Sequence, residues 1–176
     1  MPKVKYTRRK GLVQEAGTGV DLTTGFDAGN GVNIRRPTVE SSASTLAPTV
    51  AQSGTLFLLT TANAVTVTLP AAEAGLHYEF QIPTTKTGDL IINAASASDT
   101  LTGAIMMTTV GSVVRTNAGQ TTAFASPDPA DHQYVADANT KGRGAGTHLI
   151  YKCMSDEIWS VSGVAISAGA TVTPFT

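Results

Sequence analysis

The side chains of this 176-residue chain that could carry acid–base or metal chemistry are few and scattered. Its three histidines, His77, His132 and His148, lie far apart in the sequence, and the first and last fall within segments that alternate like strands. Metal sites in proteins bring several ligating side chains to one point. We therefore interpret these histidines as solvated or hydrogen-bonded structural residues, and we predict no metal site from them.

The segment SPDPADH, residues 126–132, brings four polar side chains close together in the sequence: Ser126, Asp128, Asp131 and His132. A calcium loop needs more oxygen ligands at a fixed spacing. A catalytic triad is defined by a geometry that seven consecutive residues do not establish. We expect neither a bound cation nor catalysis from this segment.

The glycine-rich segment KGRGAG, residues 141–146, is the second candidate motif. It lacks the GxxxxGK[ST] order that cradles phosphates, and no strand-to-helix transition surrounds it. We interpret it as a flexible loop, predict no cofactor and no catalytic residue, and expect that the protein is not an enzyme.

Cysteine content and hydropathy indicate the cellular compartment in which the chain folds. Cys153 is the only cysteine, so no internal disulfide forms. No stretch approaches the roughly 20 apolar residues of a membrane span, and no apolar core follows the basic start of the chain. We expect folding in a reducing cytoplasm, no export signal and no membrane partner.

Alternation of apolar and polar residues is the main structural signal. In VTVTL, residues 65–69, and in HYEFQI, residues 77–82, every second residue is apolar, which is typical of half-buried strands. Pro70 and Gly75 favour a turn between them. We expect these two strands to be neighbours in one sheet.

Similar short strands recur at intervals of about ten residues, and only 14% of the residues are charged. Strands are expected at 55–61, 88–95 and 99–107, a hairpin over 112–125, a single helical turn within 128–135, a hairpin over 147–163 that buries Trp159, and a tail from 164. The predicted fold is all-β, a single sandwich, jelly-roll or barrel-like domain with an extended N-terminal arm. The predicted boundaries are 1–54 for the arm and linker and 55–176 for the β-domain, with a long loop region near 106–146.

The strand pattern resembles a β-module that recurs in virion proteins of tailed phages, most of all in capsid decoration (cement) proteins. The similarity covers residues 55–105 and 146–163, in segments such as TVTLPAA, LIINAAS and GTHLIYKCMSDEIWSVSG. It is a pattern of strands and turns without a catalytic signature. The resemblance implies an oligomer, often a trimer, although a dimer fits the sequence nearly as well.

Basic residues are concentrated at the N-terminus. Residues 1–36 carry a net charge of plus four and the remainder minus five. We predict that this arm binds a partner through Lys3, Lys5, Arg8, Arg9, Lys10, Arg35 and Arg36. An acidic patch on the major capsid protein and a second copy of this chain are the favoured partners, because strand addition needs little side-chain specificity. Nucleic acid is disfavoured, since the arm has one aromatic residue near its cations and no folded recognition module.

Together these features predict a non-enzymatic capsid decoration protein that binds and stabilises a phage shell and is located on the capsid surface of the virion. Two other interpretations stay open. The first is a component of a tail, baseplate or fibre, and the second is a carbohydrate-binding module that uses Trp159 and Tyr151.

Overall fold

The computed structural model describes residues 36–109, 121–125, 131–168 and 171–176, together with four short strands nearer the N-terminus. The chain divides into two units, residues 1–35 and residues 36–176. In the first unit, β1 (Lys3–Thr7) pairs antiparallel with β2 (Gly11–Ala16), and β3 (Phe26–Asp27) pairs antiparallel with β4 (Gly31–Val32).

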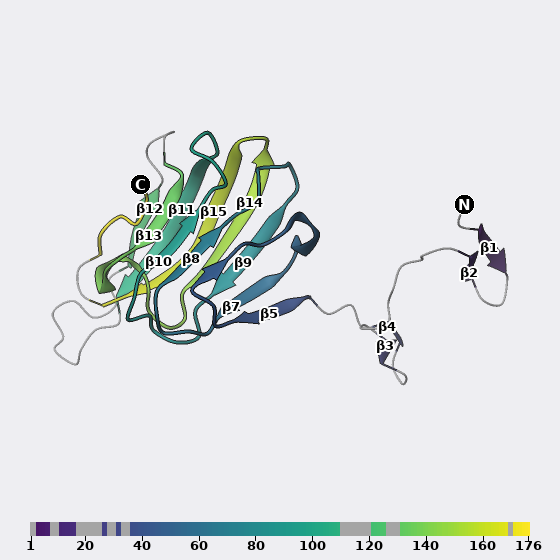
Figure 1. Ribbon diagram of the computed structural model, residues 1–176, viewed down its shortest axis with the longest axis horizontal. Coiled ribbons are helices and arrows are strands. Elements are labelled where there is room, and N and C mark those ends of the chain that lie inside the picture. The colour runs from purple at the N-terminus through teal and green to yellow at the C-terminus, as the bar shows by residue number, and fades with distance from the viewer. Residues whose placement is uncertain are drawn as a thin grey trace. The chain divides into compact units, whose positions relative to one another are not determined.

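The second unit is a two-layered β-structure, and the all-β prediction is confirmed (Figure 1). Its larger sheet has seven strands in the order β12–β11–β15–β14–β9–β7–β5, and its smaller sheet has four in the order β13–β10–β8–β6. The strands are β5 (Thr38–Ser41), β6 (Thr45–Leu46), β7 (Leu56–Leu59), β8 (Val65–Thr68), β9 (His77–Gln81), β10 (Leu90–Asn93), β11 (Thr100–Thr109), β12 (Thr121–Ala125), β13 (Gln133–Ala136), β14 (His148–Ser155) and β15 (Ile158–Ser167). Two 3-10 turns accompany them, η1 (Val50–Gln52) and η2 (Asn139–Lys141).

From β5 to β10 successive strands alternate between the two sheets. The chain passes to the opposite sheet after every strand, so β5, β7 and β9 lie side by side in the larger sheet while β6, β8 and β10 lie side by side in the smaller one (Figure 1). All four of these neighbouring pairs are parallel. The expectation that 65–69 and 77–82 are neighbours is therefore wrong: the turn at Pro70 and Gly75 carries the chain from one sheet to the other.

The core lies between the two sheets. Phe57 and Phe80 stack with ring centroids 5.6 Å apart, and Tyr78 lies 5.9 Å from Trp159. All four rings are almost fully buried, so the prediction that Trp159 belongs to the core is confirmed. From the smaller sheet, Val65, Val67, Leu90, Ile92 and Tyr134 complete this core.

Three other expectations differ from the structure. Residues 38–46, assigned to a linker, form β5 and β6, and the β-domain begins at Arg36 rather than at Thr55. The expected helical turn is replaced over Gln133–Ala136 by β13, whose alternation of half-buried and buried residues fits a sheet. The expected tail begins as the end of β15, and its Phe175 is buried against Tyr134.

The C-terminal hairpin is confirmed. β14 and β15 pair antiparallel, with Cys153 opposite Trp159, and the turn contains Glu157 at a positive φ of 68°. β15 also pairs in parallel with β11, so it joins two parts of the larger sheet. β12 pairs antiparallel with β11, whereas the first arm of the predicted 112–125 hairpin lies outside the described residues.

Candidate binding surfaces

The outer face of the larger sheet carries an exposed surface whose residues follow from the strand register. Side chains alternate between the two faces of a strand, so residues two apart lie on the same face. Met106 pairs with Ala123 on one side and with Val164 on the other, and Val164 pairs with His148. These residues form one row across β12, β11, β15 and β14.

A second row lies beside the first. Ala104 pairs with Ala125 and with Ser162, which in turn pairs with Ile150. We name the apolar residues of the two rows the outer apolar patch: Ala104, Met106, Ala123, Ala125, Ile150 and Val164. Met106 is 53% exposed and Val164 is 41% exposed. Ile105 and Met107, the residues before and after Met106, are buried in the core.

The other half of the same face is charged. The carboxylate of Glu79, at the centre of β9, lies 2.6 Å from Nη1 of Arg36 and 2.9 Å from Nε2 of His148. Nε of Arg36 also donates to the carbonyl of Gly54. The hydrogen bond from Arg36, with a smaller contribution from His148, lowers the pKa of Glu79 against the opposing effect of its burial.

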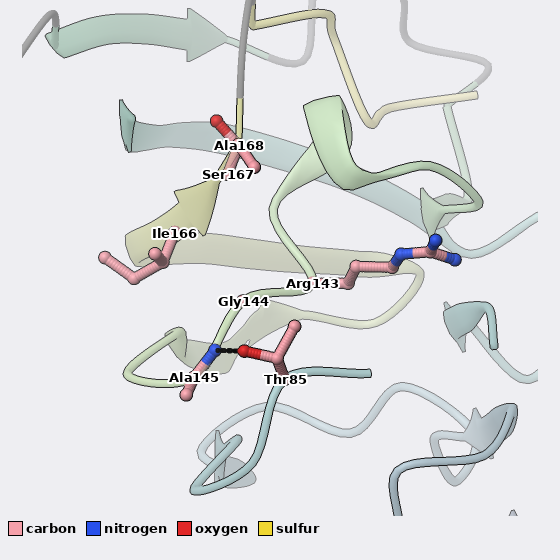
Figure 2. A pocket seen from close by; sticks show the side chains of 7 residues that line it. All are labelled: Thr85, Arg143, Gly144, Ala145, Ile166, Ser167 and Ala168. Carbon is pink, nitrogen blue, oxygen red and sulfur yellow. Dashed lines mark hydrogen bonds between the residues drawn. The ribbon is translucent and has the colours of Figure 1, made fainter. Parts of the chain in front are cut away.

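Beyond Val164 the outer face leads to a cavity of about 360 Å³, lined by Thr85, Arg143, Gly144, Ala145, Ile166, Ser167 and Ala168 (Figure 2). Ile166 and Ser167 come from the end of β15, and the backbone N–H of Ala145 donates to Oγ1 of Thr85 across 3.0 Å. The guanidinium of Arg143 points away from the other lining side chains (Figure 2) and lies 3.7 Å from Asp89.

The glycine-rich segment 141–146 forms one wall of this cavity and is held by hydrogen bonds. The Tyr134 hydroxyl donates to the carbonyls of Lys141 and Gly142, and the Thr147 hydroxyl donates to Gly142 as well. A Cβ on Gly142, which has a positive φ of 83°, would lie 2.6 Å from Ala165. This segment is therefore a fixed wall, in contrast to the flexible loop predicted from its composition.

Next to the cavity lies a buried lysine. Lys86 is 1% exposed, and its ammonium donates to the backbone carbonyls of Leu59, the last residue of β7, and of Thr61, which follows that strand. Its backbone N–H donates to the carbonyl of Arg143. Burial lowers the pKa of Lys86. Lys86 therefore joins its own segment to the segment after β7 and to the segment that contains Arg143, which is a structural role.

Of the predicted arm residues, the structure describes the side chain of Arg36 alone. Its guanidinium is bound to Glu79 within the β-domain, so this residue also anchors the start of that domain. Lys3 and Lys5 belong to β1, for which backbone pairing is described, while Arg8, Arg9, Lys10 and Arg35 lie outside the described residues. The role predicted for the arm stays a prediction.

The chemistry-bearing residues do not converge within the described part of the chain. No group of three or more His, Cys, Asp or Glu side chains there is placed to hold a metal ion. Asp131 is buried and His132 is half-buried, whereas Ser126 and Asp128 lie outside the described residues. Trp159 and Tyr151 are fully buried, so neither ring is available to stack on a sugar, as the carbohydrate-binding interpretation requires.

The outer apolar patch was not predicted from the sequence. Its signal was present in GAIMMT and VSGVAI, where apolar residues occupy both alternating positions. That pattern is typical of a strand covered on both faces. No helix among the described residues is long and apolar enough to span a membrane.

Comparison of this chain with protein-family models, with curated proteins and with solved structures finds no match to any of them.

Proposed function

We propose that this chain is a non-enzymatic structural protein of a virion, a decoration protein that binds the outside of a capsid shell and stabilises it. The observation that best supports this proposal is the division of the chain at residues 35 and 36 into a basic N-terminal unit and a separate β-sandwich domain. The strand pattern that resembles capsid decoration proteins lies within the second unit.

The proposed mechanism is binding. The N-terminal unit attaches to an acidic patch on the major capsid protein through its basic side chains and through backbone pairing. A protein that contacts several shell subunits at once binds the assembled shell better than the separate subunits, which stabilises the shell by mass action and by avidity. This mechanism requires no cofactor, metal ion or catalytic group.

A binding titration on purified empty shells tests the proposal. Three proteins are compared at low and high salt: the full chain, residues 36–176, and a variant with Lys3, Lys5, Arg8, Arg9 and Lys10 replaced by glutamine. We expect the truncated protein to lose binding. The neutralised protein should bind more weakly, with a smaller salt dependence, because exposed ion pairs contribute about 0.2 to 1 kcal/mol each.

Lys152→Gln, which removes an exposed cation of the β-domain, is the control and should bind like the unchanged chain. Undiminished binding by residues 36–176 would remove the arm from the mechanism. Binding by none of the proteins would contradict shell attachment. Quantitative mass spectrometry of the intact particle supplies a second test, because a copy number far below that of the shell subunits would favour a tail, baseplate or fibre component instead.

A further inference from the structure

We propose that the outer apolar patch is a self-association surface that packs against the same patch of a second copy. This inference goes beyond shell binding and does not depend on it. It concerns the half of the larger sheet formed by β12, β11, β15 and β14, opposite the face that covers the core.

Exposure and register define this surface. Met106 and Val164 are neighbours across β11 and β15, and both are among the most exposed large apolar side chains of the described residues. The remaining patch residues are alanines and Ile150, so the two rows carry no charge between β12 and His148. Burial of the patch would be favourable, because none of its six residues is ionised and would have to lose its water.

The area is sufficient for a specific contact. Strands are about 4.8 Å apart and rise about 3.3 Å per residue, so β12, β11, β15 and β14, with five, ten, ten and eight residues, present roughly 500 Å² of sheet before the relief of the side chains is included. A stable protein interface covers about 800 Å² on each partner. The four strands, with the patch at their centre, therefore offer enough area for an interface at the small end of the specific range.

The distribution of charge favours a second copy as the occupant. A strongly charged partner would find no complementary charge on the patch, whereas a second copy presents an equally uncharged surface. Glu79, Arg36 and Lys152 lie toward one side of the patch and would remain at the rim of such a contact. A patch that binds itself forms a closed two-fold pair. The geometry therefore favours a dimer over the trimer that the sequence resemblance implies.

Sedimentation equilibrium of the full chain, over a wide range of protein concentration, tests this proposal. We expect a dimer for the unchanged chain and a monomer for Val164→Lys, with dimerisation weakened at least tenfold. Val50→Lys is the matched control: Val50 is 49% exposed but belongs to η1, away from the patch, so this variant should remain a dimer. Circular dichroism at about 25 °C should give all three proteins the same β-sheet spectrum, which shows that the variants fold; the melting temperature of Val164→Lys is expected to be lower because the dimer no longer stabilises the folded chain.

Several outcomes would overturn the proposal. A monomeric unchanged chain would remove the interface, and a dimer that persists in Val164→Lys would locate association elsewhere, for example in the arm. A trimer that dissociates in Val164→Lys would contradict the two-fold contact. Should Val164→Lys fail to fold, Met106→Lys is measured in its place, because the side chain of Met106 is more exposed and tolerates a cation more readily. Each of these results is independent of whether the protein binds shells.

Discussion

The guanidinium of Arg36 and the carboxylate of Glu79 lie 2.6 Å apart and join the first residue of the β-domain to the middle of β9 in its larger sheet. Because the Glu79 side chain is 16% exposed, this pair is less screened by solvent than an ordinary surface ion pair. The contact also holds the start of the β-domain against this sheet.

We predict that Glu79→Gln lowers the free energy of unfolding by about 1 kcal/mol at neutral pH. Its pKa is lowered in the folded protein, so its contribution to stability is present above the unfolded pKa of about 4.3 and is lost as the pH falls through the folded value. Urea unfolding at neutral and acidic pH should therefore bring wild type and Glu79→Gln together at low pH. The control is Glu40→Gln, an exposed glutamate on β5, and an equal effect of both changes would contradict the prediction.

Two truncated proteins test where the β-domain begins: at residue 36, as in the structure, or at residue 55, as expected from the sequence. Residues 36–176 should unfold at nearly the same temperature as the full chain. Residues 55–176 lack β5 and β6, whose Val39 and Leu46 pack on the core, and should lose at least about 2 kcal/mol of stability. Differential scanning calorimetry measures both, and equal stability of the two would show that β5 and β6 contribute nothing.

Replacement of Trp159 by alanine should cost about 3 to 5 kcal/mol, because the fully buried indole packs against Tyr78. The unchanged protein should show the blue-shifted emission of a buried indole, which its single tryptophan makes simple to record. Denaturant unfolding followed by circular dichroism measures the cost. Emission at the wavelength of indole in water would refute the core position.

Gly103→Ala should destabilise the protein far more than Gly75→Ala, although both glycines have a positive φ. A Cβ at Gly75 meets nothing within 4 Å, so that change costs about 1 to 2 kcal/mol of backbone strain. A Cβ at Gly103 would lie 2.2 Å from the carbonyl oxygen of Val161 on β15, and the total cost should exceed about 3 kcal/mol. Thermal unfolding of the two variants measures the difference, and equal melting temperatures would argue against the close approach of β11 and β15.

Buried Lys86 should make stability rise with pH on the alkaline side. Burial lowers its pKa, so between the folded value and the unfolded value of about 10.4 the unfolded chain binds more protons, and stability increases with pH. This increase should disappear in Lys86→Met and remain in Lys152→Met, which alters an exposed lysine. Urea midpoints from about pH 7 to about pH 10 test it, and a slope that survives in Lys86→Met would assign the effect to other groups.

Most strands could be predicted from the sequence, but the strands with which they pair could not. The alternation of 65–69 and 77–82 depends on local burial and was interpreted correctly, whereas the assignment of the two strands to different sheets depends on contacts between distant residues. β5 and β6 have four and two residues, too few for a periodic signal. Trp159 was predicted to be buried because its hairpin is local and amphipathic.

The candidate surfaces were harder to predict for the same reason. The sequence predicts a partner-binding role for Arg36, and it could not show that the fold also brings Glu79 and Gly54 against this residue. Likewise, Met106 and Met107 are chemically identical in the sequence, yet one is exposed and the other is buried. The faces of a strand alternate predictably, but which face is covered depends on how many sheets the whole chain forms.

The position of β15 has a consequence for the order in which the chain acquires its structure during synthesis. β15 follows the other six strands of the larger sheet in the chain, and it pairs with β11, which precedes it by nearly sixty residues, as well as with β14. Until β15 leaves the ribosome, the larger sheet consists of two separate pieces, β12–β11 and β14–β9–β7–β5. Since pairing of distant strands is slow, β11 and β14 each keep an unpaired edge until β15 docks between them, and a nascent chain that stops before Ile158 retains both open edges.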